Sequence, residues 1–256
     1  MVHMQKTIIR AKKGVKIKSP ILVEGLPGIG LVGKIAADYL VKSMNAKKIA
    51  NIYSPYFPPQ VLMRKNGVVR MLGMRLYHIP QKKNDILVLA GDVQPSVPEA
   101  HFEVCERILK YFKKKKGQLI VTLGGYGSGK AAPNPKVFGA ANSQKLAEKF
   151  SKTGIEFGKT KGAIVGAAGL LLGLAKFEKM DAICLMGETH GAYVDPKSSL
   201  AVIKALEKAL GIRLDTAKLE HEIKAGEKFA KKIEEQMAKA GGEQANAGIN
   251  DLSYIR

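Results

Sequence analysis

The sequence predicts an α/β fold with a mostly parallel sheet that is flanked by helices, as in phosphorylase- and hydrolase-like folds. Short apolar segments bounded by Gly and Pro alternate with segments of helical periodicity, which is typical of βαβ units. A chain of 256 residues can also bury a large core. We expect an α/β domain over residues 1–214, a C-terminal helix over 215–240 and a flexible tail over 241–256.

The first half of the chain shows continuous apolar runs, which are typical of buried strands, separated by turn-forming residues. Asn66-Gly67 tolerates the two positive φ angles of a type I′ turn, so it predicts a β-hairpin. The predicted elements are a strand at 21–23, a helix at 31–43, a strand at 49–53, a hairpin of 60–64 and 68–79, and a strand at 85–90.

In the second half, helices alternate with strands. Pro98 and Glu99 begin a helix with one apolar face, which ends in the cations at 113–116 that complement the helix dipole. Small apolar residues at 162–176 predict a buried helix. The other predicted elements are strands at 118–123 and 181–186 and helices at 143–151 and 197–210.

From Asp215 onward, apolar residues recur at spacings of four and three between Lys and Glu. This pattern predicts a long helix with a narrow apolar seam, which we call the C-terminal seam. It packs either on another subunit or on the chain's own sheet, and we favour an oligomer interface. Its members are Leu219, Ile223, Ile233 and Met237.

The composition is strongly basic, with a formal net charge of +20. A basic surface attracts phosphate groups, so nucleic acid is one candidate partner. However, only seven of the 42 basic residues are arginine, and sequence-reading sites usually need its bidentate guanidinium. Nucleic acid is therefore disfavoured, and the lysine-rich, tryptophan-free composition fits a hyperthermophile.

No secretion or membrane signal is recognisable. Cys105 and Cys184 lie in apolar stretches, where a thiol behaves as a small hydrophobic side chain, so neither a disulfide nor a zinc site is predicted. The longest uncharged apolar run, 162–175, is too short to span a bilayer. We expect a cytoplasmic protein without a membrane partner.

A glycine-rich segment, Gly28-Ile29-Gly30-Leu31-Val32-Gly33, matches the dinucleotide-binding fingerprint between a strand and a helix. The acidic residue that would bind the ribose is missing, since Lys47 and Lys48 stand about 20 residues further on. We favour a packing role, in which the glycines allow a tight turn and a close approach of the helix. Dinucleotide binding is the alternative.

A second glycine-rich segment, 124–130, has the glycines and the lysine of a P-loop. The next residue is Ala131, where a P-loop has the Ser or Thr that binds magnesium. Pro133 and Pro135 interrupt the helix that would hold the phosphates. No ATP hydrolysis and no cofactor are predicted.

Several polar residues follow predicted strands, where open α/β sheets bind ligands: Glu24, Asp92, Glu188, His190 and Asp195. Against catalysis, 187–191 lacks a metal-ligand spacing, no Ser or Cys occupies a nucleophile elbow, and loop acids commonly cap helices. We predict a protein that is not an enzyme and holds no metal. The alternative is an enzyme or sensor that binds a nucleoside or nucleotide through Glu24, Gly28, Gly30, Glu188 and His190.

Two blocks of the sequence are distinctive. Residues 20–40, PILVEGLPGIGLVGKIAADYL, and residues 187–191, GETHG, followed by Asp195-Pro196-Lys197, resemble signatures of the PAC2 family of archaeal proteasome-assembly chaperones. The resemblance covers roughly residues 5–232. It implies an α/β core without hydrolase chemistry, a homo-oligomer with a tetramer as the favoured size, and binding to the 20S proteasome.

The resemblance also implies a docking segment. Proteasome partners of this kind commonly end in a hydrophobic-Tyr-X tripeptide that enters pockets between α-subunits. This sequence departs from that pattern, because Tyr254 is third from the end. An arm with aromatic and aliphatic side chains still suits pocket insertion, and a frayed terminus without a role is the alternative. The predicted contacts with the 20S α-subunits are Leu252, Tyr254, Ile255 and Arg256.

Together these features predict a proteasome-binding chaperone or adaptor. It would assist proteasome assembly, activate degradation without ATP, or do both.

Overall fold

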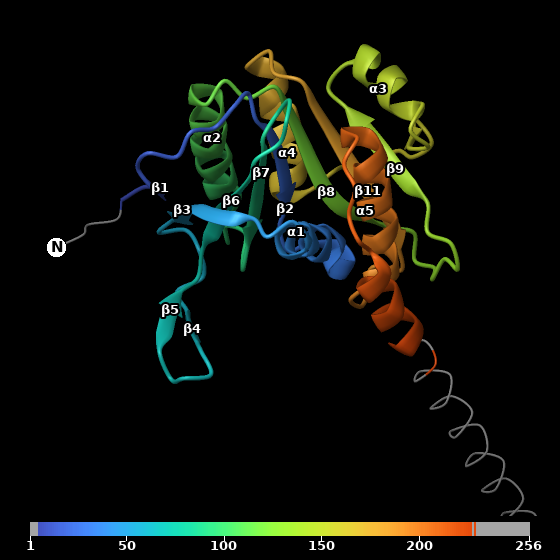
Figure 1. The fold of residues 1–256 in the computed structure, drawn as a ribbon, viewed down its shortest axis with the longest axis horizontal. Helices are drawn as coiled ribbons and strands as arrows, with labels where there is room; N and C mark the ends of the chain where they lie inside the picture. Colours follow the sequence, from blue (N-terminus) through green and yellow to red (C-terminus); the bar gives the residue numbers. More distant parts are fainter. Residues whose placement is uncertain (1–4, 227, 229–256) are drawn as a thin grey trace, which may run out of the picture. The chain divides into compact units, whose positions relative to one another are not determined.

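The computed structural model describes residues 5–226 and 228. The chain divides into two compact units, Met1–Leu214 and Asp215–Arg256. Within the described residues of the first unit, nine strands form one sheet in the order β1-β3-β6-β7-β2-β8-β11-β9-β10, and helices flank it (Figure 1). The predicted α/β fold class is confirmed.

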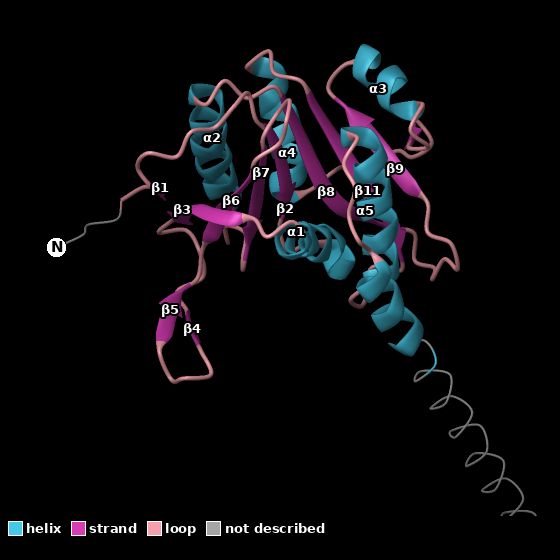
Figure 2. Cartoon of the chain, viewed as in Figure 1, coloured by secondary structure: helices cyan, strands magenta, loops and turns pink. Residues whose placement is uncertain are grey.

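Figure 2 distinguishes the strands from the helices. The strands are β1 (Ile8–Ala11), β2 (Ile21–Gly25), β3 (Lys47–Tyr53), β4 (Val61–Met63), β5 (Val69–Met71), β6 (Met74–Ile79), β7 (Ile86–Gly91), β8 (Leu119–Gly127), β9 (Val137–Ala141), β10 (Glu156–Phe157) and β11 (Ala182–Thr189). The helices are the 3₁₀ turn η1 (Ile29–Leu31), α1 (Val32–Ser43), α2 (Pro98–Lys114), α3 (Gln144–Ser151), α4 (Gly166–Phe177) and α5 (Pro196–Leu210).

The centre of the sheet is parallel and its flanks are mixed. Strands β7, β2, β8 and β11 run parallel, whereas β6 is antiparallel to β7, β3 to β6, β1 to β3 and β9 to β11. The expectation of a mostly parallel sheet is therefore wrong outside the centre. For β6 and β7 a short connection explains the difference, because the link from Ile79 to Ile86 is too short for the crossover that parallel neighbours need.

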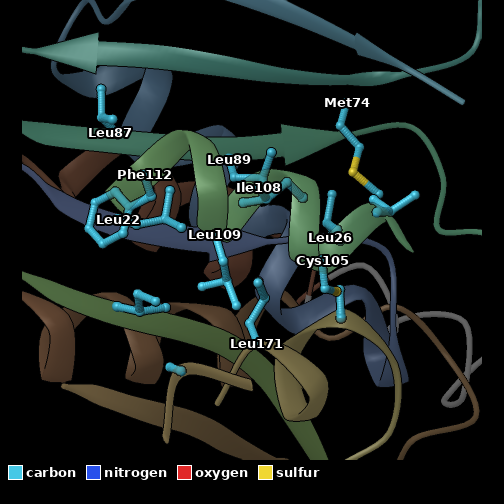
Figure 3. Packing of buried hydrophobic residues seen from close by; sticks show 14 of the residues in the cluster. Leu22, Leu26, Met74, Leu87, Leu89, Cys105, Ile108, Leu109, Phe112 and Leu171 are labelled. Atoms are coloured by element: carbon cyan, nitrogen blue, oxygen red, sulfur yellow. The ribbon is translucent and has the colours of Figure 1, made fainter. Parts of the chain in front are cut away.

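Helices cover both faces of the central strands. Helices α2 and α4 contact each other on one face, and α1 and α5 contact each other on the other. Between the sheet and α2 lies an apolar cluster that includes Leu22, Leu89, Ile108 and Phe112 (Figure 3). Burial on both faces explains why β7 is a continuous apolar run, and why the first three residues of β2 are apolar too, rather than alternating with polar ones.

The hairpin predicted around Asn66-Gly67 is formed by β4 and β5. Its turn differs from the expected type I′. Gly67 has a φ of 76°, but Asn66 is not among the residues with positive φ, and the Gly67 N–H donates to the carbonyl of Arg64 at 2.9 Å. One left-handed residue therefore closes a longer loop, in which the side chain of Asn66 accepts from the N–H of Val68.

Most other predicted elements have observed counterparts with shifted ends. Helix α4 begins four residues later than expected, because Gly162 has a φ of 141°, which a helix does not accommodate. The sequence reading missed β1, β9 and β10, which are short strands at or near the sheet edges.

In the second unit, residues 217–226 are helical, within the range predicted for the C-terminal helix. The Asp215 carboxylate accepts the N–H of Ala217 at 3.1 Å at the start of this helix. Leu219 is buried and Ile223 is half-buried. Ile233 and Met237 lie outside the described residues, so the C-terminal seam stays a prediction.

Candidate functional site

A cavity of about 320 Å³ lies at the carboxyl-end side of the parallel strands. Strand β2 contributes Glu24, β8 contributes its glycine-rich end, and β11 contributes Cys184 and Met186. The loop before η1 and the start of α4 complete the wall. The lining residues are Glu24, Leu26, Gly28, Ile29, Gln94, Leu123–Gly127, Ala163–Gly166, Ala168, Cys184 and Met186.

Glu24 is the acidic side chain in this wall. It is 1% exposed, and its Oε2 has no hydrogen-bond partner. Burial raises the pKa of Glu24 to about 8, and a hydrogen bond with the backbone of Leu26 offsets this only in part. The carboxyl group is therefore largely protonated at neutral pH. In the protonated form it can both donate and accept a hydrogen bond.

Two thiols share the environment of Glu24. Burial raises the pKa of Cys184 to about 12, and burial also raises the pKa of Cys105 on α2. Both cysteines are free and buried, as expected for small hydrophobic side chains. Neither thiol has the lowered pKa of a reactive nucleophile.

Two glycines of the dinucleotide-like segment, Gly30 and Gly33, serve close packing. A Cβ atom at Gly33 would overlap the carbonyl oxygen of Leu123 on β8, and one at Gly25 would overlap the carbonyl oxygen of Gly33. Gly30 has a φ of 60°, and a Cβ there would lie 2.9 Å from the Thr189 hydroxyl. These contacts support the packing interpretation, because they let α1 lie directly on the sheet.

The P-loop-like segment is part of a strand. Gly124, Gly125 and Gly127 belong to β8, which pairs with β11 as far as the contact between Gly127 and Thr189. A P-loop instead wraps around phosphate between a strand and a helix, whereas the next element here is strand β9. The segment therefore forms the floor of the cavity rather than a phosphate loop.

Gln94 joins two sides of the cavity. Its Nε2 donates to the carbonyl of Pro27 at 2.6 Å, and its Oε1 accepts the N–H of Ala167 at 2.8 Å. One side chain thereby ties the loop before η1 to the start of α4. No sequence signal identified Gln94 or Tyr126, because their roles depend on residues distant in the chain.

Of the five residues predicted for a ligand loop, Glu24 and Gly28 line the cavity. Gly30 is buried beside Thr189, while Glu188 and His190 lie outside the lining. The His190 ring stacks on Tyr193 with centroids 5.1 Å apart, and the backbone of Glu188 pairs with Lys136. In this cavity Glu188 and His190 do not form one site with Glu24, contrary to the expectation. Strand β11 extends to Thr189, and both residues lie past the part of this strand that lines the cavity.

Two further loop acids have structural roles. Asp195 begins α5 by accepting the N–H of Ser198 at 2.9 Å, which is the capping role considered for it. Asp92 binds Arg70 of β5 at 2.6 Å and Arg75 of β6 at 2.7 Å. Although burial opposes ionisation, the hydrogen bonds and charges of these arginines hold the pKa of Asp92 well below its usual range.

Among the described residues, no group of three His, Cys, Asp or Glu side chains could hold a metal ion. Within the same part of the chain, no helix is long and apolar enough to cross a membrane. The predicted docking residues Leu252, Tyr254, Ile255 and Arg256 lie outside the described residues.

Comparison with known proteins identifies the family. A profile of the PAC2 family matches residues 22–240. The chain belongs to the PAC2 family. An uncharacterized protein of Methanocaldococcus jannaschii is 38% identical over 259 residues, covering the whole of both chains.

Crystal structures of relatives share the fold. PbaB of Pyrococcus furiosus, described as an archaeal proteasome activator, is 38% identical, with a TM-score of 0.85 over 90% of this chain and 100% of that chain. PbaA of the same organism, described as an archaeal homolog of proteasome-assembly chaperone, is 27% identical, with a TM-score of 0.79 over 98% of this chain and 100% of that chain.

Proposed function

We propose that this PAC2 protein is a chaperone or adaptor that docks on the α-ring of the 20S proteasome. The observation that carries the proposal is the 38% identity to PbaB, a proteasome activator, across the whole of that chain. The similarity to PbaA supports the same partner. The higher identity to PbaB favours activation over a role restricted to assembly.

The tail is the proposed docking element. Leu252, Tyr254 and Ile255 place aliphatic and aromatic side chains after a polar, glycine-containing run, and such side chains dominate binding when they fill a pocket. One short segment binds weakly. A homo-oligomer that presents several tails would strengthen docking through effective concentration.

The test is a pull-down with 20S particles that compares the full chain with a truncation after Ala240 and with a Leu252→Ser/Tyr254→Ser variant. We expect the full chain to retain the particles and both altered proteins to lose most of that retention. A matched control, Gln244→Ala/Asn246→Ala, changes two polar residues of the same segment and should bind normally.

One outcome would contradict the proposed partner, and another would contradict the proposed docking element. If the full chain does not bind 20S particles, the proteasome is the wrong partner. If the truncated chain binds as well as the full chain, the body carries the interface. The exposed apolar side chains of the β4–β5 hairpin, among them Met63 at 77% and Val69 at 57% exposure, would then be the next surface to alter.

Activation is tested separately by peptide hydrolysis with and without the protein, in the absence of ATP. An ATP-independent increase with small or unfolded substrates supports activation. Binding without any increase would leave assembly as the role.

A further inference from the structure

We propose that the cavity over Glu24 binds a small, uncharged, planar molecule whose polar edge carries a hydrogen-bond donor next to an acceptor, such as a nucleobase or a carboxamide. The site is independent of proteasome docking and is built wholly within the first unit. Its four supports are an unpaired buried carboxyl oxygen, the volume of the cavity, its uncharged lining and its fixed rims.

The first support is the unpaired oxygen of Glu24. Buried polar atoms are normally hydrogen-bonded, and an unsatisfied one is costly. Glu24 lies opposite Leu89 of β7 and Thr122 of β8 in the strand register, near the carboxyl end of a strand that has a neighbour on each side. Its unpaired oxygen is therefore buried between strands rather than exposed on an edge strand.

The second support is the volume. A cavity of about 320 Å³ falls at the small end of the usual range for ligand sites, roughly 300–1,000 Å³. A single bridging water, which occupies about 30 Å³ in the liquid, would leave most of this space unfilled. The absence of side chains at Gly28 and Gly124 keeps the space open, because a Cβ at Gly124 would meet no heavy atom within 4 Å.

The third support is the lack of cationic side chains in the cavity lining. Of the described residues that line the cavity, none is Lys or Arg. A phosphate or carboxylate would therefore lose its hydration without gaining a cation, which is strongly unfavourable. This lining selects against a nucleotide, while a protonated carboxyl side chain matches the donor and acceptor of an amide-like edge.

The fourth support is rigidity. Gln94 fixes the two rims by hydrogen bonds of 2.6 and 2.8 Å, and the ring of Tyr126 is held edge-on by Phe138 with centroids 5.0 Å apart. A site that is held open before binding loses less conformational entropy when a ligand enters. Tyr126 also supplies an aromatic surface against which a planar ligand can pack.

The test uses calorimetric titration and thermal unfolding of the full chain with adenine, cytosine and nicotinamide. AMP, CMP and nicotinate serve as their charged counterparts. We expect at least one uncharged probe to bind with one site per chain at up to millimolar concentration and to raise the unfolding temperature. We expect its charged counterpart to bind at least tenfold more weakly.

Three variants locate the site. Glu24→Leu removes the polar edge from an apolar setting and should weaken binding about tenfold or more, whereas Glu24→Gln keeps a donor and an acceptor and should retain binding within a few-fold. Gly124→Leu should abolish binding by filling the cavity. Glu188→Gln changes a carboxylate outside the lining and should leave binding unchanged.

Each contrary result overturns the proposal. Failure of all the uncharged probes to bind would indicate a water-filled structural cavity. Preferential binding of AMP, CMP or nicotinate would contradict the uncharged class. Normal binding by Gly124→Leu, with unaltered thermal stability, would place the site elsewhere. None of these results would affect the docking proposal, which has its own readout.

Discussion

The carboxyl side chain of Glu24, on a central strand, is almost completely shielded from solvent. The neighbouring groups that face it are the thiols of Cys105 from α2 and Cys184 from β11, and neither supplies a positive charge. Burial therefore dominates and raises the pKa of Glu24 to about 8.

The folded protein should lose stability between about pH 4.5 and pH 8 on account of Glu24. In this window the unfolded chain ionises the group while the folded chain keeps it protonated, so the contribution is fully present below the unfolded pKa and is lost as the pH rises through the folded one. Relative to Glu24→Gln, we expect the wild type to lose up to about 1.4 kcal/mol per pH unit. Urea denaturation of both proteins at pH 5 and pH 8 measures the difference.

A difference between Glu24→Gln and wild type that stays constant from pH 5 to pH 8 would show that the group does not titrate as described. A control carboxyl change, Asp38→Asn on an exposed part of α1, leaves Glu24 in place and should therefore keep the loss of stability that we attribute to Glu24.

Gly33 tests the packing role of the glycine segment. Because an added Cβ would meet the backbone of Leu123, which cannot move aside like a flexible side chain, we expect Gly33→Ala to destabilise the protein by about 1–3 kcal/mol or more. Gly173 on α4 is a matched control, since a Cβ there meets nothing within 4 Å. Gly173→Ala should stabilise the helix by about 0.5–1 kcal/mol. Thermal unfolding compares the two, and equal effects would refute the close approach of α1.

The β4–β5 hairpin is a two-stranded element that pairs outside the main sheet and projects from it (Figure 1). Isolated hairpins are marginally stable in water, and this one exposes apolar side chains. The ion pairs of Asp92 with Arg70 and Arg75 therefore act as an anchor that joins β5 to the strands of the sheet.

Removing the charge of Asp92 should loosen the hairpin. We expect Asp92→Asn to destabilise the protein by about 1–3 kcal/mol, because two partly buried arginines lose a charged partner. Amide hydrogen exchange should rise first at residues 61–71. The pKa of Asp92 is lowered, so its contribution is present above the ordinary carboxyl range and lost on acidification, and the difference from wild type should shrink at low pH.

The control for this prediction is Asp38→Asn, which breaks the exposed pair with Lys34. That change should alter stability by less than about 1 kcal/mol. Unchanged exchange at residues 61–71 in Asp92→Asn would mean that other contacts hold the hairpin.

At the scale of the whole molecule, the proposed function combines the α/β domain with the C-terminal segment that docks. Docking by several tails requires an oligomer, and the C-terminal seam is the surface predicted for it. A long helix with an apolar stripe is costly to leave in water.

We expect Ile223→Lys/Ile233→Lys to dissociate the oligomer into folded monomers and to weaken 20S binding, because single tails bind poorly. Sedimentation and circular dichroism decide the outcome. An unaltered oligomer would place the subunit interface elsewhere, and unfolding would assign the helix to the monomer core. His221→Lys/Lys224→Glu changes exposed positions of the same helix and serves as the control.

Local sequence was sufficient for the fold class, for most helices and central strands, and for the packing role of Gly30 and Gly33. Buried parallel strands leave continuous apolar runs, and tight turns require glycine, so both are visible within a short window. The two blocks around residues 20–40 and 187–191 were likewise sufficient to recognise the PAC2 family, which the comparison confirmed.

The cavity and the antiparallel flanks required the three-dimensional arrangement. Glu24, Gln94, Tyr126 and Cys184 are far apart in the chain, and only the strand order β7-β2-β8-β11 brings their loops and strand ends together. The sequence predicted Glu24 just after a strand, whereas it lies inside β2. Its burial, its unpaired oxygen and its separation from Glu188 depend on which residues surround it. Those neighbours are set by long-range packing, which no local pattern encodes.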